Sequence, residues 1–254
     1  MNDMTTYTIR PIPQIPALYI KEKEMVVIAD LHIGIENELQ QQGLHASTQL
    51  SQMWYMIRKI CNDYNPKIIV LLGDIKHSIP LTPFHEKKQL QSFFKELTKY
   101  ATIQVIPGNH DGNIQWYLTN DIILHESDGV VIDSLAFVHG HRWPKESLMN
   151  ASYLLMGHTH PTVMLQDRLK YESYESCWIR TRLDPEKTKE HYSTFNEDLE
   201  LIVIPAFNPL CGGLAVNKDG IMGPMNTIVD QDKNEYFLLD GSYLGTNKTL
   251  QQEE

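Results

Sequence analysis

The sequence predicts an α/β protein with a mixed β-sheet, and two patterns along the chain lead to this class. In the first half, runs of apolar and β-branched residues alternate with segments of helical periodicity, which is typical of parallel strands joined by helices. In the second half, strand-like runs follow one another, which is typical of a mixed rather than a wholly parallel sheet. The 254 residues can form one large domain with a substantial core. No linker or repeat divides the chain, so we expect a single domain over residues 1–254.

The first half begins with an extended segment and then alternates strands with helices. Three prolines between Tyr7 and Ile20 favour an extended edge segment that ends in a short strand. Ser47 is the expected N-cap of a helix that Asn65 and Pro66 end. The expected strands are 17–20, 25–29, 67–72 and 102–106, and the expected helices are 36–42, 48–64 and 84–100, with Met53, Ile57, Ile60, Leu90, Phe93, Phe94 and Leu97 on their buried faces.

The second half is richer in strands. We expect strands at 122–124, 130–132, 135–138, 153–156, 162–165, 176–182, 201–204 and 236–239. Alternation in 176–182 places Trp178, Arg180 and Arg182 on one face, and we expect a packed tryptophan beside solvated arginines rather than a surface that stacks on bases. The polar stretch 183–200 predicts a loop or short helix, within a variable segment at about 166–200.

The composition limits the classes of function. The formal net charge of -10 argues against a protein that grips nucleic acid mainly by its own basic surface, although a local positive centre can still attract phosphates. The apolar run 68–72 is far too short to span a bilayer, and residues 1–7 do not resemble a secretory signal, so we expect a cytoplasmic protein without a membrane partner. Cys61, Cys177 and Cys211 are far apart and predict reduced, structural thiols.

Polar clusters follow five of the strand-like runs. Since functional groups of open α/β sheets gather at the carboxyl ends of strands, these clusters should converge in one crevice. Taken singly, each has an ordinary alternative as a turn, a cap or a surface residue. Together they supply oxygen and nitrogen donors without a thiolate, which suits manganese, iron or zinc in mixed coordination. The clusters are Asp30-Leu31-His32, Gly73-Asp74, Gly108-Asn109-His110-Asp111, His139-Gly140-His141 and Gly157-His158-Thr159-His160.

These five blocks, in this order, resemble the motifs of the calcineurin-like metallophosphoesterases over roughly residues 25–161. The resemblance implies a four-layer α/β/β/α sandwich with two mixed β-sheets, the metallo-dependent phosphatase fold. A narrower likeness is to the small archaeal phosphoesterases related to the nuclease SbcD. It rests on residues 73–77, 108–112, 177–180, 205–208 and 239–241.

The resemblance also implies a binuclear metal centre, with manganese preferred and iron or zinc as alternatives. His110 would protonate the leaving oxygen or hold it by a hydrogen bond, with Asp111 orienting the imidazole. His139 and His141 compete for one ligand place; the family pattern favours His139 and leaves His141 as a substrate contact or an outer group. One ion would be held by Asp30, His32 and His160, the other by Asn109, His139 and His158, and Asp74 would bridge them.

The activity implied by the resemblance is hydrolysis of a phosphate ester by a metal-activated water. A phosphodiester of DNA or RNA is the preferred substrate, and a homodimer is left open. The alternative is a phosphodiesterase or pyrophosphatase that acts on a small nucleotide, which a tight pocket walled by residues 166–200 would favour. A non-catalytic protein-binding scaffold is disfavoured, because such relatives lack the counterpart of His110. Lys76 and His77 replace an acidic or arginine residue of many relatives, and we expect both to be solvent-exposed and outside the core site.

Overall fold

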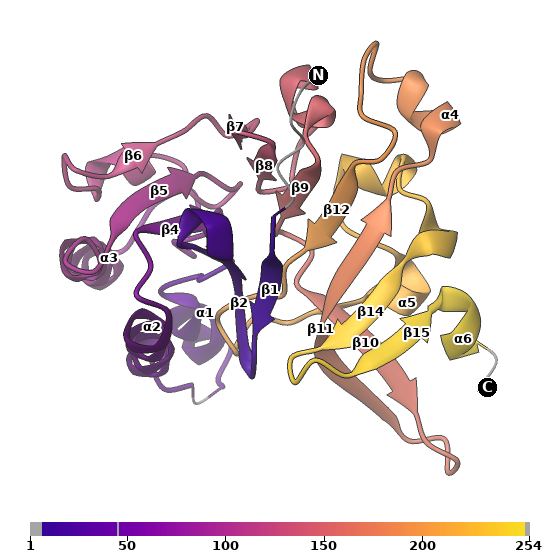
Figure 1. Ribbon diagram of the computed structural model, residues 1–254. Coiled ribbons are helices and arrows are strands. Elements are labelled where there is room, and N and C mark those ends of the chain that lie inside the picture. Colours follow the sequence, from indigo (N-terminus) through magenta and orange to yellow (C-terminus); the bar gives the residue numbers. More distant parts are fainter. Residues whose placement is uncertain (1–6, 45, 252–254) are drawn as a thin grey trace.

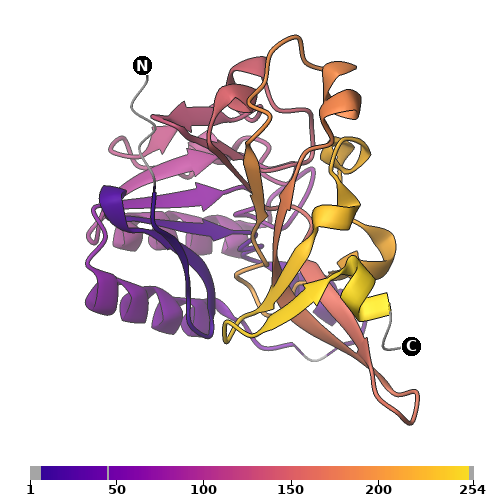
Figure 2. The same cartoon turned by 45° about the vertical axis from the view of Figure 1, so that its right-hand side comes forward.

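The computed structural model describes residues 7–44 and 46–251, in which two β-sheets pack face to face between layers of helices (Figures 1 and 2). Both sheets contain parallel and antiparallel strand pairs. This arrangement confirms the α/β sandwich with two mixed sheets that the sequence resemblance implied. Within the described residues, every helix lacks the length and apolar character that a bilayer crossing requires.

The N-terminal half of the chain builds the first sheet and the two long helices beside it. Its elements are β1 (Ile9–Ile12), β2 (Ile15–Ile20), β3 (Met25–Ala29), α1 (Ile35–Gln41), α2 (Leu50–Tyr64), β4 (Ile68–Leu72), α3 (Phe84–Leu97), β5 (Thr102–Ile106) and β6 (Ile123–Leu124). β1, β2 and β3 pair antiparallel, whereas β3, β4, β5 and β6 run parallel. β3 is buried along its whole length, because a second layer covers each of its faces.

Helices α2 and α3 cover the outer face of the first sheet (Figure 1). All the residues predicted for their inner faces are buried against this sheet, which confirms the helical periodicity. The prediction of Ser47 as N-cap is wrong: α2 begins at Leu50, after Gln49, and has no side-chain cap. The helix ends as predicted, with Asn65 in the left-handed conformation before Pro66.

The C-terminal half builds the second sheet. Its elements are β7 (Val130–Ile132), β8 (Leu135–Val138), β9 (Tyr153–Met156), β10 (Pro161–Gln166), β11 (Glu172–Arg182), α4 (Pro185–Lys189), β12 (Glu200–Val203), β13 (Leu214–Ala215), α5 (Val216–Asp219), β14 (Glu235–Leu238), β15 (Tyr243–Thr246) and α6 (Asn247–Gln251). β11 pairs with β10, β12 and β14, so part of the segment 166–200 belongs to the sheet. The sequence did not predict β13, α5, β15 and α6, which are too short to show a periodicity.

An apolar layer fills the space between the two sheets. Val27 and Leu72 of the first sheet lie in it with Phe137 and Leu155 of the second. Trp178 is buried in the same layer, while the exposed Arg180 and Arg182 form ion pairs with acidic residues, as the sequence predicted. This packing brings the carboxyl ends of β3, β4 and β5 next to those of β8 and β9.

Candidate metal centre

Five loops meet where these strands end. His158 N–H donates to the Asp30 carboxylate at 3.0 Å and so joins the loop after β9 to the loop after β3. Asn208 Nδ2 donates to the Leu31 carbonyl at 2.8 Å and supports the loop after β3 from the other side. The structure thus brings the sequence-predicted donors together: Asp30, His32, Asp74, Asn109, His110, His139, His158 and His160.

Several of these donors have an unusual backbone conformation. A positive φ is uncommon outside glycine, and it costs on the order of 1 kcal/mol or more per residue. Here these residues turn the chain sharply next to the strand ends, and their own side chains belong to the donor cluster. The donors with positive φ are Asp30 (55°), His32 (40°), Asp74 (47°), His158 (67°) and His160 (46°).

The first group of donors lies around His32. His32 Nε2 is 3.3 Å from His160 Nε2 and 3.6 Å from Asp74 Oδ2. His160 Nε2 is in turn 3.3 Å from Asp30 Oδ1. Two imidazole nitrogens between two buried carboxylates form a mixed nitrogen and oxygen donor set that suits a divalent transition metal.

The second group contains Asp74, His139 and His158, whose ligand atoms lie within 4.8 Å of one another. His139 Nε2 is buried without an aligned hydrogen bond and lies 3.3 Å from Asp74 Oδ2. A buried polar atom without a partner is rare in proteins and fits a metal ligand. Asn109 is exposed and lines the same hollow. Asp74 belongs to both groups, which is the position required of a bridging carboxylate.

His141 lies outside both groups. Its Nε2 accepts a hydrogen bond from Arg142 Nε at 3.0 Å, and its ring centroid is 5.4 Å from that of His139. Burial lowers the pKa of His141 to about 4. The geometry therefore favours His139 over His141 for the ligand place.

The charges of the donor cluster favour the binding of a cation. Burial opposes the charged form of His139, but the Asp74 and Asp30 carboxylates outweigh it and raise its pKa to about 9. Burial lowers the pKa of His32 to about 3 and that of His158 to about 4. His32 and His158 are therefore neutral imidazoles beside ionised carboxylates, which is the form that binds metal. His139 holds a proton because of the same carboxylates and would release it to bind a cation, so the residues present fit two divalent cations.

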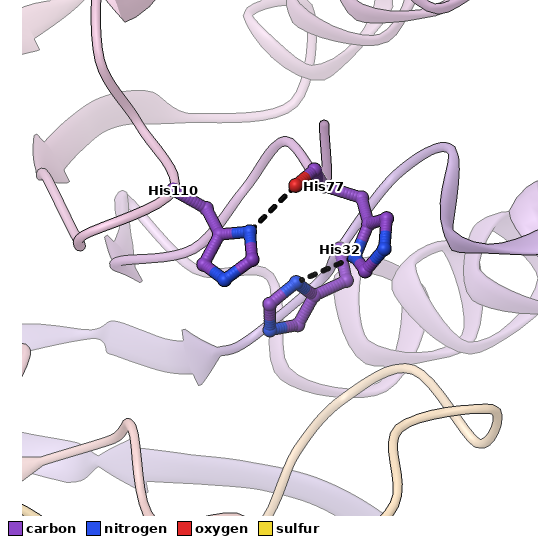
Figure 3. A group of neighbouring side chains, drawn as sticks. All are labelled: His32, His77 and His110. Atoms are coloured by element: carbon purple, nitrogen blue, oxygen red, sulfur yellow. Dashed lines mark hydrogen bonds between the residues drawn. The ribbon is translucent and has the colours of Figure 1, made fainter. Parts of the chain in front are cut away.

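His110 is held by a different partner from the one the sequence analysis expected. Its Nδ1 lies 2.5 Å from the His77 carbonyl oxygen (Figure 3). Its backbone N–H donates to Asp74 Oδ1 at 2.8 Å. Asp111 instead accepts from the N–H groups of Ile75 (2.9 Å), Lys76 (3.1 Å) and Gly108 (2.9 Å). The prediction that Asp111 orients the His110 imidazole is therefore wrong, because its carboxylate is turned toward the backbone of the loops after β4 and β5.

Asp111 thus has a structural role that joins two loops of the centre. Burial, with the nearby charge of Asp74, raises the pKa of Asp111 to about 6. The hydrogen bonds that it accepts from the N–H groups of Gly108 and Lys76 lower this pKa and offset part of the effect of burial.

The prediction that Lys76 and His77 are solvent-exposed is wrong. Lys76 is fully buried, and its Nζ donates to the Ser78 carbonyl at 2.6 Å. The His77 side chain is 12% exposed and contacts His32. Glu86, in the first turn of α3, accepts from the N–H groups of His77 and Ser78 and holds the loop against the helix. Glu86 is only nine and eight residues from these partners, but a single acidic residue in the first turn of a helix gives no sequence signal that it holds the preceding loop.

Cys211 is a further residue that the sequence did not associate with the site. Its Sγ belongs to a potential donor group with His32 and His160, and lies 3.9 Å from the Asp30 carbonyl oxygen. Burial and the two nearby carboxylates raise the pKa of this thiol, so it stays protonated. Cys61 and Cys177 are free and buried.

Gly108 makes the fit around Asp74 tight, because a Cβ at this position would overlap Asp74 Oδ1 and lie 2.5 Å from its backbone nitrogen. We expect Gly108→Ala to displace the Asp74 carboxylate, to weaken manganese binding and to lower the free energy of unfolding by about 1–3 kcal/mol. Titration calorimetry and thermal unfolding measure both effects. Gly112→Ala is the matched control, since a Cβ there meets nothing within 4 Å. Unchanged manganese affinity in Gly108→Ala would contradict the tight fit.

Known proteins are similar to this chain in sequence or in fold. A model of the calcineurin-like phosphoesterases matches residues 24–198. Among solved structures, the nuclease MPE of Pseudomonas putida is 18% identical, with 92% of this chain and 96% of that chain covered and a TM-score of 0.56. The phosphoesterase Yfce of E. coli is 18% identical, with 87% and 96% covered and a TM-score of 0.39. A search of curated proteins found no match. The family match confirms the resemblance carried by the strand-end motifs: the chain belongs to the calcineurin-like phosphoesterase family and is a hydrolase of phosphate esters.

Proposed function

We propose that this protein is a two-metal phosphodiesterase that cleaves DNA or RNA, with manganese as the preferred metal and iron or zinc as alternatives. The observation that carries the proposal is the position of Asp74 Oδ2, which lies 3.6 Å from His32 Nε2 and 3.3 Å from His139 Nε2. Divalent cations bound there would supply a water of lowered pKa and would polarise the phosphate ester. The proposed ligands are Asp30, His32 and His160 for one ion, Asn109, His139 and His158 for the other, and Asp74 for both.

His110 is the proposed donor to the leaving oxygen. Its Nδ1 faces the His77 carbonyl, and that oxygen can only accept, so Nδ1 carries a proton. Nε2 is then the nitrogen that can hold the second proton and pass it to the leaving group. The His110 side chain is 22% exposed and lines the same hollow as the ligands, so a substrate can reach it.

The shape of the surface near the centre supports a long substrate. A hollow of about 340 Å³ is lined by ligands of both proposed ions, and an adjoining hollow of about 500 Å³ contains Arg142. Asn109 lines both hollows. Among the described residues that line them, none comes from the segment 166–200, which was the expected wall of a small-nucleotide pocket. A nucleic-acid strand can therefore extend to either side of Asn109, and the nuclease MPE of Pseudomonas putida shares the fold.

A substrate panel tests the proposal. We expect the purified protein with manganese to hydrolyse bis-p-nitrophenyl phosphate and single-stranded or duplex nucleic acid, and we expect exhaustive chelation to abolish both activities. Returning manganese should restore them. Activity that survives chelation would rule out the metal-dependent mechanism. Faster hydrolysis of cyclic nucleotides than of strands would favour a small nucleotide, and metal binding without hydrolysis of any substrate would favour a protein-binding scaffold.

A further inference from the structure

The His77 ring lies between a proposed metal ligand and a carboxylate of α1. Its Nδ1 is 3.2 Å from His32 Nδ1, and its Nε2 is 2.6 Å from Glu38 Oε2. The carbonyl oxygen of the same residue contacts His110 Nδ1 at 2.5 Å. Figure 3 shows the contacts of His77 with His32 and with His110. One residue therefore contacts both a proposed metal ligand and the proposed acid.

The positions of the protons in this row of side chains follow from the geometry. His32 Nε2 faces Asp74 and His160, so it is the nitrogen available to a metal ion. A neutral imidazole has a single N–H, which His32 must then carry on Nδ1. His77 Nδ1 accepts that hydrogen, so the proton of His77 is on Nε2. Glu38 is an acceptor and receives it. The three side chains thus have one consistent arrangement of hydrogen bonds.

We propose that Glu38 and His77 are positioning residues, which hold the ring of His32 in the tautomer and orientation that bind metal, while the His77 carbonyl holds His110. The inference rests on the two-metal function proposed above. A histidine that binds a metal commonly donates its second ring N–H to an acceptor held in place by the protein. Removal of that acceptor lowers metal affinity by about 10–100-fold.

The backbone of His77 is itself well placed for this role. Its N–H lies 3.1 Å from the Ile33 carbonyl and 3.2 Å from Glu86 Oε1. These contacts hold the loop after β4 against the loop after β3. The backbone of His77 is therefore held in place without the His32 ring, and Glu38 contacts the other nitrogen of its imidazole, so His77 is placed to position that ligand.

Variants of Glu38 give the first test, because this side chain is 57% exposed and is not needed for the core. We expect Glu38→Ala to weaken manganese binding by about 10-fold, measured by calorimetric titration of the metal-free protein. Glu38→Gln keeps an acceptor for His77 Nε2–H and should bind manganese nearly as tightly as wild type. A simple effect of the lost charge would weaken both variants equally, and that result would overturn the proposal. Gln41→Ala, an exposed change on the same helix, is the control.

Variants of His77 give the second test. We expect His77→Leu to lower manganese affinity by about 10–100-fold and His77→Asn to restore most of it, since Asn Oδ1 can take the place of Nδ1. At saturating manganese, kcat of His77→Leu should return toward the wild-type value, because its backbone carbonyl still holds His110. His85→Leu, at an exposed histidine of α3, is the control. Wild-type affinity in His77→Leu would overturn the proposal; if that variant does not fold, the Glu38 pair decides.

Failure of this inference differs from failure of the proposed function. If wild type binds manganese but hydrolyses no phosphodiester, the proposed function fails, and the affinities of the Glu38 and His77 variants still test the positioning role. If wild type hydrolyses the substrate and the variants bind manganese normally, only the positioning role fails.

Discussion

Asp74→Asn is expected to leave the protein with at most one bound metal ion and to lower kcat/KM for phosphodiester hydrolysis by about 10³-fold. Asp74 Oδ2 lies close to the imidazole nitrogens of both His32 and His139, so a single carboxylate serves both donor groups. The neutral amide of asparagine removes the negative charge that two neighbouring cations need between them. Elemental analysis after dialysis measures the metal content, and bis-p-nitrophenyl phosphate measures the rate.

Asp121→Asn is the matched control, because this carboxylate is exposed and lies outside both donor groups. It should keep wild-type metal content and rate. Two equivalents of metal retained by Asp74→Asn would show that the ions do not share this side chain, and the binuclear arrangement would have to be given up.

His110→Ala is expected to keep both metal ions and to lose about 10²–10⁴-fold in kcat on substrates with poor leaving groups, such as nucleic acid. His110 Nε2 is 4.0 Å from Asp74 Oδ2, and its ring is outside the two proposed ligand sets. Its removal therefore affects the proton that the leaving oxygen needs. Steady-state rates on a nucleic-acid strand and on bis-p-nitrophenyl phosphate measure the difference.

The p-nitrophenolate leaving group is stable without a proton, so the loss on bis-p-nitrophenyl phosphate should be much smaller. His110→Gln can donate a hydrogen bond but no proton, and it should recover only the part of the rate that comes from holding the leaving oxygen. His85→Ala, at an exposed position of α3, is the control. An equal loss on both substrates would argue against a role as general acid.

Most of the strands and both long helices could be predicted, because their signals are local. The apolar run of β3 and the helical stripe of α2 are each contained in fewer than twenty residues. The strand ends also identified Asp30, Asp74 and His110 as candidates. The N-cap was wrongly predicted at Ser47, and the shortest helices and strands were not predicted. At these positions the local conformational preference is weak, and tertiary contacts determine the backbone conformation.

The hydrogen-bond partners that hold the residues of the site in place could not be predicted from local sequence patterns. Asp111 seemed placed to orient its neighbour His110, but its carboxylate instead accepts from the backbone near β4. His77 looked like a surface residue, yet it contacts His32 and Glu38. These partners are distant in sequence, so no spacing rule connects them.

The sequence by itself determined which donors follow which strand, and therefore the family and the chemical class of the centre, because the end of a strand and the residue after it are local properties of the chain. Only the tertiary structure decided which donors share a site. His32 and His160 are 128 residues apart, and their Nε2 atoms come within 3.3 Å because two sheets pack face to face with their strand ends aligned. The partners of His77 and Asp111 were decided in the same way, since a buried polar group bonds to whichever group the packing places beside it.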